Sequence, residues 1–539
     1  MRRLWIFLCL LVLSLAACRL FTPGAFLETP TPGAQSTQTP LAPTPTSTPL
    51  PRQPTSSPVP LLAHPVPVPE ESFAVRTHPD GGLYVGDLVS LEIIAPKDFD
   101  LEGQRVQVEV DAEPQITLGP VDFGRFGIGG RSQATLLWSW DTSGLQADDY
   151  NLTFTILPDG HTWMENISLL PEDQVPAPEP QAQWAIAETE CCLIHYITGT
   201  AAERDLHLLQ EIIDQQAYTA SQRMQVELDQ PIEITFLPRV LGHGGFASGD
   251  ISVSYLDRNY AGDGTEIVLH HEMVHILDGR LGGDLRPTLL VEGVAVYLSG
   301  GHFKPELLMP RAAALLEPPV TCIHSVPDTG SEVGPSMVQG CSLSQYLPLP
   351  ELIDNFYFSQ HEIGYLQAGA LVEFMVDTWG WQAFSDFYRN IKPIEDGSQS
   401  EAMDAALQVH LGLSLEELEA HFVETLREQP VTPDFAEDVR LTVSFYDTVR
   451  RYQRMLDPSA YFLTAWLPGN EQMRERGIVA DYLRHPSAPE NLALESMLVA
   501  ADAYLRSGDF ERTQLMLDSV NAVLDVFSTH SLDLSNLAE

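Results

Sequence analysis

The sequence has little positive charge. Lysine and arginine account for 29 of its 539 residues, against 74 aspartates and glutamates, which gives a formal net charge of −45. A chain this acidic repels the phosphates of nucleic acids, so a nucleic-acid partner is excluded. A chain of this length is also too long for one ordinary core, and about two to four domains are expected.

Cysteine is scarce as well. The chain has 6 cysteines and no CxxC spacing, so a zinc site built from cysteines is not supported. Cys322 and Cys341 lie at the ends of a loop rich in glycine, proline and serine, which outside the cytoplasm favours a disulfide between them. Closing that loop would contribute roughly 3 kcal/mol. The adjacent Cys191 and Cys192 are not expected to pair with each other.

The apolar run at the N-terminus is too short to span a membrane. Two arginines precede it, residues 4–15 are almost entirely apolar, and the run ends in the letters LAAC at Cys18. This order is typical of a secretory signal peptide. The cysteine after Leu-Ala-Ala resembles the bacterial lipobox, which implies a lipoprotein signal peptide over 1–18 and a lipidated Cys18. The protein would then be held on the outer side of the cell membrane. A plain signal peptide and an uncleaved anchor are the alternatives.

Composition divides the rest of the chain. Residues 19–70 are dominated by proline, threonine and serine and are expected to form a disordered stalk. Residues 71–175 carry short alternating or β-branched runs and read as all-β. Within them, WSWDTSGLQADDYNLTFTILPDG resembles the late strands of immunoglobulin-like sandwich domains. Residues 431–539 have helical spacing, and AADAYLRSGDFERTQLML resembles one tetratricopeptide-type helix pair.

A metal-binding pattern lies in residues 180–430, which mix strands and helices. His271 and His275 are four residues apart, so they share one face of a helix expected to start near Asp263 or Thr265 and to end at Gly279. Two imidazoles at this spacing can bind one zinc ion, and Glu272 beside them can reach a water on the metal.

A second helix supplies the expected third ligand. It should begin at Pro287, a residue suited to the first helical position, and end at Gly300 or Gly301. Glu292 within it would complete a site of two histidines and one glutamate that leaves one position open. Gly293 and Ala295 are small enough to let this helix approach the first one closely.

The two helices together resemble a family. HEMVH at 271–275 followed by PTLLVEGVAVY at 287–297 is similar to the HExxH and PxxLxEGxAxY pattern of gluzincin metallopeptidases of the peptidase-MA-like group. The family usually has tryptophan where Leu289 or Leu290 stands. The resemblance covers about 190–430.

It implies an α+β zincin-like peptidase domain over 180–430, with Zn2+ as the cofactor and a peptide or protein as the substrate. The expected fold class is therefore multidomain. An all-β immunoglobulin-like sandwich precedes the peptidase domain, and an α-helical tail follows it.

The resemblance also implies the roles of individual residues. Glu272 would act as general base, and a tyrosine or histidine on a later helix would stabilise the oxyanion. Tyr365 is the first candidate and His361 the second, on a helix opened by Ser359 and Glu362 as a capping box. Tyr297 should point away from the metal and serve packing, since five residues after Glu292 is a rotation of about 140°.

Three other parts of the chain are expected near the ligands, namely two single residues and one segment. His270 precedes the first ligand and faces elsewhere, so it is expected to be a neighbour of the site. Asp278 is a candidate to orient an imidazole, because Val296 stands where some gluzincins have an acid. The segment ISVSYLDR at 251–258 is either an ordinary strand or an edge strand that pairs with an extended substrate.

Two other functions remain open. The chain could be a catalytically silent surface lipoprotein that keeps a metallopeptidase-like fold as a binding module, or a stalk protein in which zinc only staples the fold. The intact Glu272 favours the active peptidase. No GAMEN motif precedes the metal helix, which favours an endopeptidase over an aminopeptidase.

Overall fold

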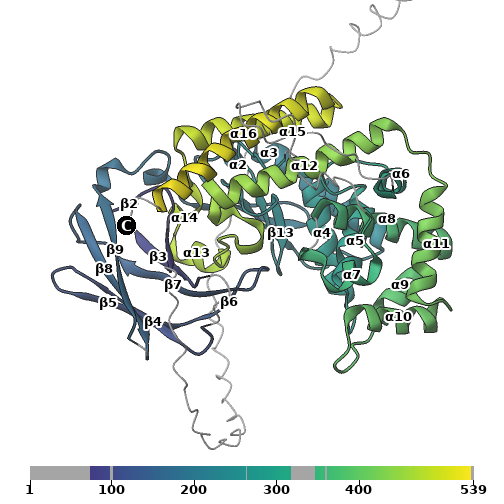
Figure 1. Cartoon of the computed structure of the whole chain (residues 1–539), viewed down its shortest axis with the longest axis horizontal. Coiled ribbons are helices and arrows are strands. Elements are labelled where there is room, and N and C mark those ends of the chain that lie inside the picture. Colours follow the sequence, from purple (N-terminus) through teal and green to yellow (C-terminus); the bar gives the residue numbers. More distant parts are fainter. Residues whose placement is uncertain are drawn as a thin grey trace, which may run out of the picture. The chain divides into compact units, whose positions relative to one another are not determined.

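The structure, a computed structural model, describes residues 73–96, 101–158, 160–262, 264–316, 346–358 and 361–535 (Figure 1). Cys18, Cys322 and Cys341 lie outside these residues, so the lipid anchor and the disulfide between Cys322 and Cys341 stay predictions. Among the described helices, none combines the length and the apolar character that a membrane crossing needs. All described residues belong to one compact unit, 65–539.

The first part of this unit is all-β, as the alternating runs predict. Its strands are β1 (Ala74–His78), β2 (Leu83–Tyr84), β3 (Leu88–Ile94), β4 (Arg105–Val110), β5 (Ile116–Asp122), β6 (Gly124–Phe126), β7 (Arg131–Asp141), β8 (Asp149–Leu157) and β9 (Thr162–Leu170). They form a four-stranded sheet in the order β1-β3-β7-β6 and a five-stranded sheet in the order β2-β9-β8-β4-β5. Every second residue of β4 is buried, and Trp140 and Phe154 are fully buried in the shared core.

A third sheet lies within the metal-binding region of the chain. It has five strands in the order β10-β11-β12-β14-β13, and β11, β12 and β14 are parallel. Its strands are β10 (Trp184–Glu188), β11 (Cys192–Ile197), β12 (Ile232–Leu237), β13 (Gly245–Ala247) and β14 (Ile251–Ser254). The prediction that 251–258 could be an edge strand is wrong, because the glycine-rich segment before it folds back and pairs with β14. The edge is β13.

The two helices of the metal pattern are α4 (Thr265–Leu281) and α5 (Thr288–Ser299). The expected end of α4 at Gly279 is wrong, because the helix continues to Leu281 and ends at Gly282, where φ is 73°. Pro287 precedes α5 directly, and Gly300 ends it with φ of 77°. Gly293 does not serve the contact with α4: a Cβ there would lie 2.6 Å from the carbonyl oxygen of Ala368, so the close approach is to α8 (His361–Trp379).

The remaining helices cover the metal-binding region and form the C-terminal part. They are α2 (Ala201–Arg204), α3 (Leu206–Met224), α6 (Leu308–Ala313), α7 (Leu349–Asp354), α9 (Trp381–Arg389), α10 (Gln399–His410), α11 (Leu415–Arg427), α12 (Pro433–Leu456), α13 (Asn470–Arg476), α14 (Ala480–Leu483), α15 (Pro489–Ser507) and α16 (Phe510–Ser535). Short 3-10 turns include η4 (Phe356–Phe358), η5 (Pro458–Ala460) and η6 (Phe462–Thr464). The adjacent α15 and α16 pack against α12 in one apolar cluster (Figure 1).

Cys191 and Cys192 are bonded to each other through their sulfur atoms, contrary to the expectation from their adjacency. The chain bends just before β11 instead of running extended. The hydroxyl of Thr189 accepts hydrogen bonds from the backbone N–H groups of Cys191 and Cys192, at 3.3 and 3.1 Å. Such a local turn competes with the strand and brings the two neighbouring side chains together.

Candidate metal centre

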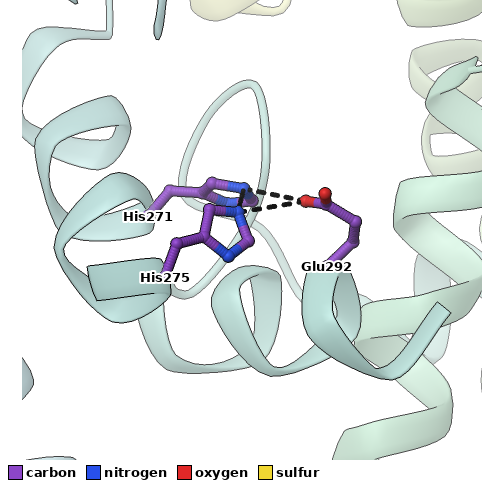
Figure 2. Close-up of side chains that lie close together, drawn as sticks. All are labelled: His271, His275 and Glu292. Carbon is purple, nitrogen blue, oxygen red and sulfur yellow. Dashed lines mark hydrogen bonds and ion pairs between the residues drawn. The ribbon is translucent and has the colours of Figure 1, made fainter. Parts of the chain in front are cut away.

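Three side chains from α4 and α5 converge on one point, as Figure 2 shows. The Nε2 atoms of His271 and His275 are 3.0 Å apart, and each lies 3.2 Å from Oε2 of Glu292. The three residues form a group in which the candidate ligand atoms all lie within 4.8 Å of one another. The helical spacing of the histidines and the position of Glu292 one helix later produce this convergence.

The electrostatics of the three residues fit a bound cation. Burial lowers the pKa of His271 to about 4, so its ring is neutral and can offer a lone pair. Burial also disfavours the charged form of His275, but Glu292 outweighs it and raises the pKa of His275 to about 9. Two imidazole nitrogens and one carboxylate oxygen with room for a further ligand suit zinc.

Glu272 lies beside the ligands and is 6% exposed. Burial raises its pKa to about 7, although His275 pulls in the other direction. The edge strand β13 passes very close to it: a Cβ on Gly245 would lie 3.2 Å from Oε1 of Glu272 and 2.5 Å from the Val268 side chain. Only glycine lets the backbone of β13 approach this carboxylate so closely.

Tyr365 is buried near the centre on α8. Its ring stacks on His302 with 3.9 Å between ring centroids, and it lies 6.1 Å from the ring of His271. His302 is in turn held by Glu362, with 3.2 Å between Nδ1 and Oε2. The backbone of His361 opens α8, but its side chain lies outside the described part of the structure. Tyr297 is half-buried against the helical core, as a packing role requires.

His270 and Asp278 have partners away from the metal ligands. The Nδ1 atom of His270 lies 2.9 Å from Oε1 of Gln216 on α3. Asp278 accepts hydrogen bonds from Arg286 at 2.8 Å and from Tyr388 at 2.9 Å, and it pairs with Arg389. The prediction that Asp278 orients an imidazole is therefore wrong, because this part of α4 faces α9. Among the described residues, no hydrogen-bond partner reaches Nδ1 of His271 or His275.

Sequence reasoning missed two residues of the centre. Tyr357 in η4 donates a hydrogen bond of 2.7 Å to Oε1 of Glu292, and His302 follows α5 and lies 5.6 Å from the ring of His271. Neither belongs to a helix of the motif. Only the aromatic letters NFYF before α8 and the histidine after Gly301 mark them in the sequence.

Tyr357→Phe should weaken zinc binding by about 10- to 100-fold, because a hydrogen-bonding partner that orients a metal ligand typically contributes this much. Competition with a chromophoric chelator measures the affinity. Tyr218→Phe on α3, whose side chain is 62% exposed, is the control and should bind zinc as the parent does. Equal affinities for Tyr357→Phe and the parent would show that Glu292 needs no such support.

Comparisons with known proteins add little to this geometry. No family model matches the chain, and no curated protein sequence matches it. Among solved structures, the chain is similar to a mutant of the M1 zinc metallopeptidase from Deinococcus radiodurans, with 12% identity over 68% of this chain and 93% of that chain and a TM-score of 0.28. This likeness is too loose to carry an argument, so the function is argued from the residues of the centre.

Proposed function

We propose that the protein is a zinc-dependent metallopeptidase, with His271, His275 and Glu292 as metal ligands and Glu272 as general base. The observation that carries this proposal is the convergence of the three ligands beside a buried glutamate, with two of the ligands, His275 and Glu292, at the wall of an open cavity. That cavity has a volume of about 1030 Å³ and is lined on one side by His275, Glu292 and Tyr357. A zinc ion that only stapled the fold would need neither the neighbouring carboxylate nor the cavity.

Each residue then has a chemical task. Zinc, when bound, polarises the scissile carbonyl and lowers the pKa of a water molecule. Glu272 accepts a proton on a carboxylate oxygen and delivers it to the nitrogen of the leaving amine. Tyr357 keeps Glu292 in place through its hydrogen bond of 2.7 Å. Tyr365 remains the proposed donor to the oxyanion, because it is buried beside the centre and its ring centroid lies 6.1 Å from that of the ligand His271.

The edge strand β13 is the proposed platform for the peptide. Gly245, Phe246 and Ala247 of this strand line a second, smaller cavity together with the metal ligands. An extended peptide paired with β13 would place its backbone beside Glu272, where Gly245 makes room. This arrangement accepts a peptide along its length, in keeping with an endopeptidase.

We propose from the N-terminal sequence that this activity lies outside the cell. We propose that Cys18 carries a lipid anchor, that residues 19–70 form a stalk, and that residues 71–175 form an immunoglobulin-like domain between the stalk and the peptidase. Two or more acyl chains on one cysteine would hold the protein stably on a membrane, whereas a single chain binds only marginally.

The full chain, purified in detergent, should bind about one zinc ion and cleave an unfolded protein substrate such as casein. A chelator should abolish cleavage and added zinc should restore it, since the proposed reaction requires the metal at these ligands. Elemental analysis and the release of peptide fragments measure both effects. Zinc without cleavage of any protein or peptide would favour the silent binding module, and a chain without zinc would contradict the metal centre.

A further inference from the structure

A cavity of about 240 Å³ adjoins the metal centre. Its polar floor consists of His271, Glu272, His275 and Glu292, with His302, Tyr357 and Tyr365 beside them. Much of its remaining lining is apolar, and this "apolar wall" comprises Ile128, Leu241, Phe246, Phe462, Ala465 and Leu467. The apolar wall comes from three separate stretches of the chain: the turn between β6 and β7, the segment around β13, and the segment that follows η5.

The turn that contains Ile128 is hydrogen-bonded to η6. The backbone N–H of Gly129 donates a hydrogen bond of 2.9 Å to the carbonyl oxygen of Leu463. Gly127 has φ of 67°, and a Cβ there would lie 2.4 Å from the same oxygen. Both the backbone conformation and the space therefore require glycine at 127. Ile128 is thus held at the cavity by its two neighbours, although it belongs to the all-β first part of the unit.

Two large side chains of the apolar wall are unusually exposed to solvent. Ile128 is 46% exposed and Leu467 is 42% exposed, whereas Leu241 and Ala465 behind them are 2% and 6% exposed. Phe462 lies near the metal centre: its ring centroid is 4.2 Å from that of His243 and 6.1 Å from that of Tyr357. Phe462 thus joins the apolar wall to Tyr357, the residue that holds Glu292.

We propose that this cavity is the pocket for the substrate side chain next to the scissile bond and that the protein prefers a large apolar or aromatic side chain there. The proposal rests on the proposed peptidase function. An apolar cavity of about 150 Å³ is enough to admit benzene, so a cavity of about 240 Å³ leaves room for a phenylalanine side chain beside the metal centre. A peptide on β13 would direct alternate side chains to the face that Phe246 lines.

The side-chain preference can be measured with the full chain and peptides that differ only at the two positions flanking the cleaved bond. The parent should cleave phenylalanine and leucine peptides at least about tenfold more efficiently than alanine peptides, the discrimination expected of an apolar pocket. Ile128→Ala and Leu467→Ala should each lower kcat/KM for the phenylalanine peptide by about three- to tenfold and leave the alanine peptide nearly unchanged. Met164→Ala, 68% exposed on β9 and outside the cavity, is the control and should match the parent.

The position of the turn gives a second pair of variants. Gly127→Ala should remove most of the preference, because the turn must move away from Leu463. Gly130→Ala tests backbone conformation alone, since φ is 59° there and a Cβ would contact nothing within 4 Å. It should keep the preference. Equal discrimination in the parent, Ile128→Ala and Gly127→Ala would overturn the proposal.

A binding measurement separates this proposal from the peptidase function itself. Zinc-loaded Glu272→Gln and its double variant with Ile128→Ala are titrated with labelled phenylalanine and alanine peptides, and fluorescence anisotropy gives Kd. Tighter binding of the phenylalanine peptide that is lost with Ile128→Ala supports the pocket even if the parent cleaves nothing, in which case only the peptidase proposal fails. Cleavage without any side-chain preference leaves the peptidase standing and overturns the pocket.

Discussion

Glu272→Gln should keep zinc at the level of the parent and lower kcat/KM by about 10²–10⁴-fold, because a general base typically contributes this much. The amide has nearly the same shape as the carboxylate but cannot accept the proton. Glu272 is outside the group of three ligands, so its replacement leaves the metal site intact. Zinc content by elemental analysis and peptide cleavage rates measure the two effects on one preparation.

Two further variants serve as controls for this result. Glu266→Gln lies on the same helix with an exposed side chain and should retain the activity of the parent. His271→Ala should lose both zinc and cleavage. If Glu272→Gln cleaves as fast as the parent, Glu272 is not the base and another group must take the proton.

Arg239→Met should lower the stability of the protein by about 3–5 kcal/mol, because it leaves buried carboxylates without their partner. The Arg239 side chain is 1% exposed. It pairs with Asp80 at 3.3 Å and with Asp457 at 3.2 Å, and it donates a hydrogen bond of 2.8 Å to Ser459. These partners come from the β region and from the C-terminal part, so one guanidinium joins three parts of the chain. The urea concentration at the midpoint of unfolding measures the loss.

The pH dependence of this loss follows from the two carboxylates. Burial already raises the pKa of Asp457 although Arg239 lowers it, whereas His78 and Arg239 overcome burial and hold the pKa of Asp80 below its ordinary value. Without Arg239 both pKa values rise. A carboxyl group whose pKa is higher in the folded than in the unfolded state stabilises the fold at low pH and loses that effect as the pH rises.

The difference in the unfolding midpoint between Arg239→Met and the parent should therefore be smaller at pH 5 than at pH 8. Arg204→Met, which removes an ion pair from a side chain 55% exposed, should shift the midpoint little at either pH. A midpoint for Arg239→Met that matches that of Arg204→Met would contradict the proposed role of the buried pair.

The metal ligands could be predicted because their geometry is local. The spacing of His271 and His275 along one helix determines that they share a face, and Glu292 lies on the next helix along the chain. The same local reasoning places Pro287 before α5 and Gly300 after it. It fails at Gly279, where nothing forces the chain out of the helix until Gly282 takes a positive φ.

The other residues around the centre depend on contacts between distant segments. Tyr357 reaches Glu292 across 65 positions of the sequence, and Asp278 turns to Arg389 across 111. The edge strand β13 has three residues in a glycine-rich stretch that reads as a loop, and it becomes a strand only because β14 is beside it. No periodicity or motif in the sequence records such pairings.

The segment that follows η5 has a further consequence for the order in which the pocket is completed. Ile128 is synthesised first, the ligands on α4 and α5 follow, and Phe462 and Leu467 emerge only after nearly all helices that surround the centre. A chain that is still being synthesised can thus contain its metal ligands while one side of the pocket is missing. The proposed preference for large apolar side chains would then arise only once the C-terminal part has folded onto the centre.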